Sequence, residues 1–144
     1  MRPVNVFVAA TGNAFMADIA GWIAEAATLL GRDARVVSHG LPEADGSLNL
    51  VVAPHEFFVL GDAADDELAR AGAACVPVCT EQPGTPWFNL AAEFVRDAPL
   101  ALAINQHGVA ALLARGVDAR HLRLGGVPSM VAPPVERDID VLFL

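Results

Sequence analysis

The chain has 144 residues and a formal net charge of −8 at pH 7. This length suits one domain built around a single hydrophobic core. The negative charge repels nucleic-acid phosphates and anionic lipid, so nucleic acid is not an expected partner. All nine basic residues are arginines. The absence of lysine excludes a P-loop lysine, a Schiff-base lysine and a lysine general base.

Hydrophobic residues make up 54% of the chain, so membrane insertion has to be considered first. The longest apolar stretch, residues 14–30, carries Asp18 and Glu25, and no integral membrane segment is expected. A signal peptide at residues 2–10 is an alternative, but its apolar run is short and alternates like a buried strand.

Cys75 and Cys79 are four residues apart in a predicted strand, too far along it for an unstrained disulfide. Two buried thiols in a reducing cytoplasm are therefore expected, and a metal site is the disfavoured alternative. No other group has metal-ligand spacing on one element, so the sequence predicts no metal. The dinucleotide motif G-x-G-x-x-G is missing after the first strand, so no cofactor is predicted.

Short apolar runs alternate with longer stretches at helical spacing, which is typical of repeated β-α units. In chain order, the first half contains a strand (4–9), a Thr-Gly-Asn turn (11–13), a helix (15–30), a strand (34–38), a loop (39–47) and a fully apolar strand (48–53). The second half contains a helical turn (56–60), a helix (64–71), a strand (74–80), a Pro/Gly loop (82–86), a helix (87–95), a strand (100–104), a helix (107–115) and a strand (120–124). The predicted fold class is α/β, a Rossmann-like doubly wound sheet of six to seven mainly parallel strands.

A Gly/Pro-rich connector at residues 125–134 precedes a further predicted strand at 139–144. A natural C-terminal strand is one interpretation of this pattern. The interpretation that we favour divides the chain into a Rossmann-like domain, residues 1–125, and a connector with the first strand of a truncated second domain, residues 126–144.

Polar residues follow the predicted strands at the points where those strands end. They are Thr11, Gly12, Asn13, His55, Glu56, Thr80, Glu81, Gln82, Asn105, Gln106 and His107. The loops that leave parallel strands meet at one edge of the sheet, where such folds bind ligands. These side chains are therefore expected to form a polar pocket.

Each candidate site residue also has a purely structural explanation. Gly12 can serve a tight turn, and Asn13 and Asn105 can cap helices. His107 can simply cover the first turn of its helix.

His55 can be a packed neutral ring, but beside Glu56 it can also be a tuned acid or base. Glu81 follows an apolar strand and must be solvated or paired, because burying a lone carboxylate costs several kcal/mol.

Several of these segments together resemble a known family. They are the strand at 4–9, the loop at 11–13, VVAPHE at 51–56, EQPGTPWF at 81–88, GGVPS at 125–129 and ERDIDVLFL at 136–144. The pattern resembles the N-terminal domain of bacterial GT-B glycosyltransferases of the group 1 type, and it covers nearly the whole chain.

The resemblance implies a cytoplasmic transferase with two domains. This half would bind a sugar acceptor, and the missing C-terminal domain would bind the nucleotide-sugar donor, so the fragment alone would be inactive. The alternative is a non-enzymatic doubly wound module for small-ligand binding or signalling. A receiver-like domain is disfavoured, since no carboxylates cluster after the first strand.

The resemblance implies that Gly12 and Asn13 would lie near the donor phosphates or the transferred sugar. His55, Glu81 or His107 would face the acceptor hydroxyl as the general base. Glu56, Gln82 and Asn105 complete the expected substrate-binding set. The family's paired glutamates seven residues apart are absent, as is a basic residue near Gly12, which leaves retaining and inverting chemistry both open.

Overall fold

The computed structural model describes residues 2–61 and 63–131. In this part of the chain one sheet contains six strands in the order β2-β1-β3-β4-β5-β6, and every neighbouring pair is parallel. The strands are β1 (Val4–Phe7), β2 (Ala34–Val37), β3 (Leu48–Val52), β4 (Val76–Cys79), β5 (Ala101–Ala103) and β6 (Ala119–His121). The predicted α/β, parallel, Rossmann-like architecture is confirmed.

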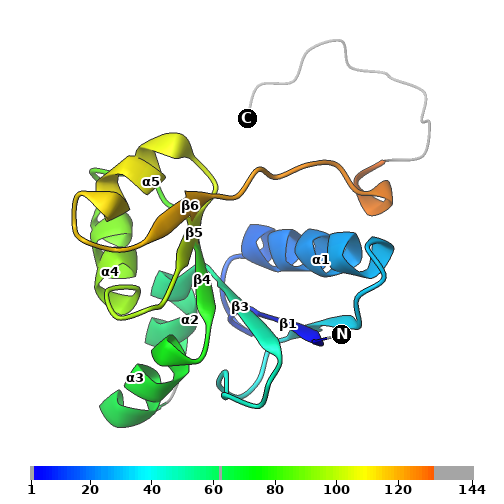
Figure 1. Cartoon of the computed structure of the whole chain (residues 1–144), viewed down its shortest axis with the longest axis horizontal. Coiled ribbons are helices and arrows are strands. Elements are labelled where there is room, and N and C mark those ends of the chain that lie inside the picture. The colour runs from blue at the N-terminus through cyan, green and yellow to red at the C-terminus, as the bar shows by residue number, and fades with distance from the viewer. Residues whose placement is uncertain (1, 62, 132–144) are drawn as a thin grey trace.

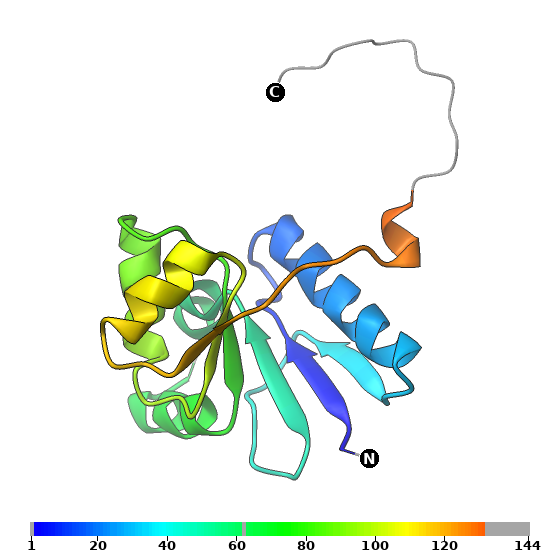
Figure 2. The ribbon, with the colours of Figure 1, turned by 45° about the horizontal axis from the view of Figure 1, so that its top comes forward.

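Five α-helices connect these strands, and Figures 1 and 2 show them on both sides of the sheet. They are α1 (Ala14–Leu29), α2 (Pro54–Leu60), α3 (Asp65–Ala73), α4 (Pro86–Phe94) and α5 (Gln106–Leu113). Successive strand residues point to opposite faces. Accordingly, Val6 packs with Ile19 of α1, whereas Phe7 packs with Phe57 of α2. The α4 and α5 side chains pack on the face that carries Cys79 and Ala103.

The position of β1 fixes where a ligand can enter the sheet. β1 lies between β2 and β3. From β1 the chain passes through α1 to β2 on one side, and the strands from β3 onward extend the sheet on the other side. The loops that leave β1 and β3 therefore diverge, and doubly wound folds bind their ligands in the crevice between such loops.

Side-chain caps define the ends of several helices. Asn13 Oδ1 accepts a hydrogen bond from Phe15 N at the start of α1, and Asn105 Oδ1 accepts one from Gly108 N at the start of α5. The capping roles expected for both asparagines are confirmed. Gly31 follows the end of α1 and has a φ of +74°. This left-handed conformation is unfavourable for residues that carry a side chain.

The element boundaries differ modestly from the sequence prediction. β1 ends at Phe7 and β6 at His121, although Val8 N still donates to the Val37 carbonyl and Leu122 N to the Ala103 carbonyl. A short 3₁₀ turn, η1 (Pro128–Met130), lies within the predicted connector, where the Ser129 backbone N–H donates to Glu25 of α1. The strand predicted at 139–144 lies outside the described residues.

The two cysteines are free and buried, as predicted. Burial raises the pKa of both thiols to about 12. Within residues 2–61 and 63–131 no three or more His, Cys, Asp or Glu side chains gather as a metal site would require. None of the described helices has the length and apolar character needed to span a bilayer.

A buried polar network ties the amino-terminal half of the sheet together. Asn5 and Asn49 are register partners on β1 and β3, and Asn5 Nδ2 donates to Asn49 Oδ1 at 3.0 Å. Arg35 Nε donates to Asn5 Oδ1, and Asn49 Nδ2 donates to the carbonyls of Glu43 and Ala74. Both asparagines are almost fully buried, so their polar atoms depend on one another.

Replacing Asn49 by alanine should lower the free energy of unfolding by about 2 kcal/mol, because Asn5 Nδ2 and two carbonyls lose their partners. Urea unfolding measures the change. Asn89→Ala is the control, since Asn89 is exposed and bonds only Arg115 among the described residues, and it should stay within about 0.5 kcal/mol. Equal losses in the two variants would contradict a stabilising role for the network.

Candidate functional site

A cavity of about 530 Å³ opens at the carboxyl ends of β1, β3 and β4, where the crossover argument places a ligand. Its walls come from the β1–α1 turn, from α2 and from the start of α4. The lining residues are Thr11, Gly12, Asn13, Met16, His55, Glu56, Val59, Leu60, Glu81 and Trp87. Its volume falls in the range of small-molecule sites.

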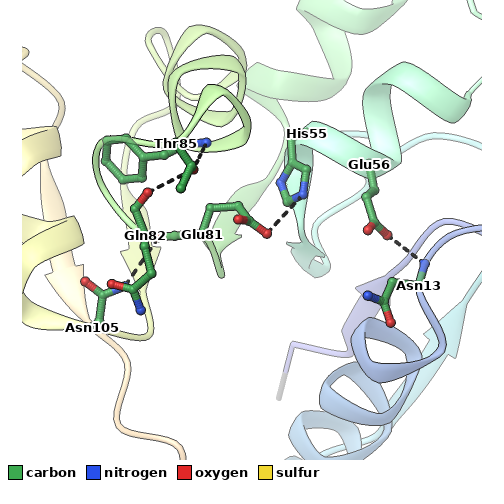
Figure 3. A network of polar contacts seen from close by, with 8 residues as sticks. Asn13, His55, Glu56, Glu81, Gln82, Thr85 and Asn105 are labelled. Carbon is green, nitrogen blue, oxygen red and sulfur yellow. Dashed lines mark hydrogen bonds and ion pairs between the residues drawn. The ribbon is translucent and has the colours of Figure 1, made fainter. Parts of the chain in front are cut away.

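The polar candidates lie in a row along this edge in Figure 3, with Asn105 at one end and Asn13 at the other. Glu81 links neighbouring loops. Its carboxylate Oε1 lies 3.4 Å from His55 Nε2, and its backbone carbonyl accepts a hydrogen bond from Asn105 Nδ2 at 3.3 Å. Side chains from the loops after β3, β4 and β5 thus meet at one residue.

His55 forms the buried side of the His55–Glu81 pair. Its side chain is 4% exposed, against 23% for Glu81, so the carboxylate is the accessible partner. The His55 ring lies beside Trp87, with 6.2 Å between ring centroids. Its Nδ1 is buried and has no hydrogen-bond partner among the described residues. Buried polar atoms usually have partners, and this nitrogen is an exception among the described residues.

Glu56 lies on the opposite side of the cavity and covers the β1–α1 turn. Its Oε2 accepts a hydrogen bond from the Asn13 backbone N–H at 2.9 Å. A Cβ atom at Gly12 would lie 2.5 Å from the same oxygen, so a larger residue there would displace the Glu56 carboxylate from this position. The carboxylate also lies at the N-terminus of α1, where the helix dipole favours a negative charge.

The remaining candidates lie outside the cavity. The Asn105 side chain donates to the backbone carbonyl of Glu81 and caps α5, so Asn105 acts on the site only indirectly. Gln82 is exposed, and its carbonyl accepts a hydrogen bond from Thr85 Oγ1. His107 is exposed in the first turn of α5. Of the eight residues predicted, the cavity brings together Gly12, Asn13, His55, Glu56 and Glu81.

Four apolar residues of the lining were not expected from the sequence. They are Met16, Val59, Leu60 and Trp87. A usable signal existed for Trp87, because it begins the helix after a strand-end loop and follows a proline suited to the first helical turn. The other three belong to helical apolar stripes, which normally indicate core.

A left-handed backbone at Ala53 sets the direction of α2. Its φ and ψ are 52° and 67°, and it is the one described residue other than glycine with positive φ. Pro54 disfavours the right-handed region for the residue before it, yet the chain must turn sharply from β3 into α2. The turn lets His55 face Glu81 while Glu56 reaches Asn13. Strained backbone of this kind is enriched at functional sites.

The charge of the cavity is negative. Glu56 and Glu81 line it, and none of its described lining residues is an arginine. His55 is its single titratable nitrogen base. Chemically, the arrangement can accept hydrogen bonds, bind hydroxyl or ammonium groups, and take up a proton on Glu81 or His55.

Substitutions at Ala53 should reveal the backbone strain. Ala53→Gly removes the penalty of about 1 kcal/mol for holding a side chain in the left-handed region. This gain offsets most of the stability that is lost with methyl burial and with the greater entropy of the unfolded chain. Ala53→Val puts a β-branched side chain into the same conformation and should lose about 2 kcal/mol or more in urea unfolding.

Ala20→Gly is the matched control, since Ala20 is fully buried in α1 with ordinary helical backbone. It should lose about 1 to 2 kcal/mol, which is more than Ala53→Gly loses. A larger loss from Ala53→Gly than from Ala20→Gly would argue against a left-handed Ala53.

Comparison with known proteins assigns no family to this geometry. No protein-family model matches the chain, and neither a curated protein nor a solved structure matches it. A function for the site therefore has to be argued from its own residues.

Proposed function

We propose that this chain is the acceptor-binding half of a glycosyltransferase that transfers a sugar from a nucleotide-sugar donor to a hydroxyl-bearing acceptor. In this proposal the acceptor occupies the 530 Å³ cavity, Glu81 takes its hydroxyl proton, and His55 holds Glu81 in place. The observation that carries the proposal is the contact between the buried His55 and the accessible Glu81 in the cavity wall.

The exposure of the two partners supports this division of roles. A general base must come within hydrogen-bond reach of the proton that it removes. Glu81 is partly exposed in the cavity, whereas the imidazole lies behind it and is almost fully buried. His55 then acts as a positioning residue that orients the carboxylate and can share its proton. His107 lies outside the cavity lining, which weakens its case as the base.

The charge of the cavity supports an acceptor in preference to a donor. Two carboxylates without an arginine beside them disfavour a diphosphate, because like charges repel strongly in a site of reduced dielectric. Trp87 is 58% exposed and offers an apolar ring face against which a sugar ring can pack. Donor phosphates would then be bound by groups outside this cavity.

The second candidate is a non-enzymatic module that binds a small ligand or transmits a signal. The strand order favours it, because doubly wound proteins of many functions bind ligands at the same crevice between β1 and β3. A module that recognises phosphate-bearing ligands would use the N-terminus of α1. Ligand class therefore separates the two proposals.

Ligand-detected NMR with the 144-residue chain can test the acceptor proposal. Neutral monosaccharides and their methyl glycosides should show saturation transfer, and Glu81→Gln should weaken the best binder by roughly 10-fold, since a hydrogen bond to a charged group is lost. Nucleotide sugars should bind no tighter than about 1 mM.

Glu43→Gln is the matched control, because it removes the same charge from an exposed residue outside the cavity lining and should leave binding unchanged. Binding of nucleotides without binding of neutral sugars would favour the second candidate. Sustained sugar transfer by the chain alone would contradict its role as one half of the enzyme.

A further inference from the structure

Two carboxylates lie in the wall of the cavity, and each has an oxygen without a partner in the described part of the chain. Glu81 contributes a carboxylate whose Oε1 faces His55, and Glu56 contributes another whose Oε2 faces Asn13. The second oxygen of each carboxylate accepts no hydrogen bond from the described residues. A ligand rich in donors would satisfy these atoms.

The buried ring of His55, in the wall of the cavity, has one nitrogen without a partner in residues 2–61 and 63–131. Its Nε2 lies 3.4 Å from Glu81 Oε1, and Nδ1 is the ring nitrogen that is left without a described partner. This Nδ1 is buried without a partner among the described residues, and His55 is more than nine-tenths buried in the cavity wall. An orphaned polar atom of this kind is costly unless another polar group pairs with it.

Glu56 disfavours the binding of anions in the cavity. The N-terminus of α1 would ordinarily attract a phosphate, but the Glu56 carboxylate already occupies that position above Gly12. The helix dipole is equivalent to about half a positive charge, so it offsets only part of this carboxylate. The remaining negative charge faces a cavity without an arginine in its described lining.

We propose that the cavity selects a hydroxylated ligand that also bears a protonated amine, and that Glu56 is the specificity residue that binds the ammonium group. This inference rests on the proposed function and names its acceptor class as an amino sugar or a similar amino-polyol. An ammonium supplies three donors and one positive charge, which matches the free carboxylate oxygens. The exposed ring of Trp87 adds a surface that attracts cations.

Three sugars of the same ring shape test the inference by calorimetric or NMR titration. D-glucosamine, D-glucose and N-acetyl-D-glucosamine are compared at about pH 7, where a large fraction of amines of this kind is protonated. D-glucosamine should bind roughly 5-fold tighter than the two neutral sugars, the advantage expected for a partly exposed ion pair. Salt at about 1 M should reduce the advantage, because it shortens the Debye length to about 3 Å.

Variants of Glu56 assign the ammonium to that residue. Glu56→Gln should bind all three sugars alike, while Glu56→Asp keeps the charge and should retain the preference for D-glucosamine. Glu43→Gln should behave as the unmodified chain does, because Glu43 lies outside the cavity lining. Thermal unfolding checks that each variant is folded. If Glu56→Gln does not fold, the comparison rests on Glu56→Asp.

The outcomes separate this inference from the function on which it rests. Equal affinities for D-glucose and D-glucosamine in the unmodified chain would overturn the amine preference and leave the acceptor role standing. A preference that survives Glu56→Gln would overturn the assignment to Glu56. Failure of all three sugars to bind would remove the support for both proposals.

Discussion

The site depends on the left-handed turn at Ala53. This residue directly follows the strand β3, and its backbone directs Pro54 into α2. As a result, two successive side chains point to different partners: His55 reaches Glu81 in the loop after β4, and Glu56 reaches Asn13 in the loop after β1. With an ordinary helical or extended Ala53, the three loops would not be joined by the same two residues.

The parallel sheet supplies the second condition, because it brings the carboxyl ends of β1, β3 and β4 to one edge. The reversal at β1 opens the loops there, and Glu56 then covers the start of α1 with negative charge. The geometry and the charge thus have different origins. The strand order determines where the cavity opens, while two glutamates determine its negative charge.

Much of this was predictable from the sequence, because strands buried on both faces read as short apolar runs and polar residues mark their ends. That reasoning found Gly12, Asn13, His55, Glu56 and Glu81. It also included Gln82 and His107, which follow strands yet lie outside the cavity, since side-chain direction at a loop depends on the local turn. The conformation of Ala53 had no signal, because positive φ is normally marked by glycine.

The positions of four arginines bear on where the donor of the proposed function could bind. Arg70 pairs with Asp66, and Arg96 with Glu93, on exposed helical surfaces. Arg115 bonds Asn89 and lies over the Phe88 ring, and Arg2 bonds the Gly46 and Ser47 carbonyls. These guanidinium groups already have structural partners and none of them lines the cavity. In the proposed function a diphosphate donor needs positive charge to be bound tightly, so it would have to be bound by groups outside this cavity.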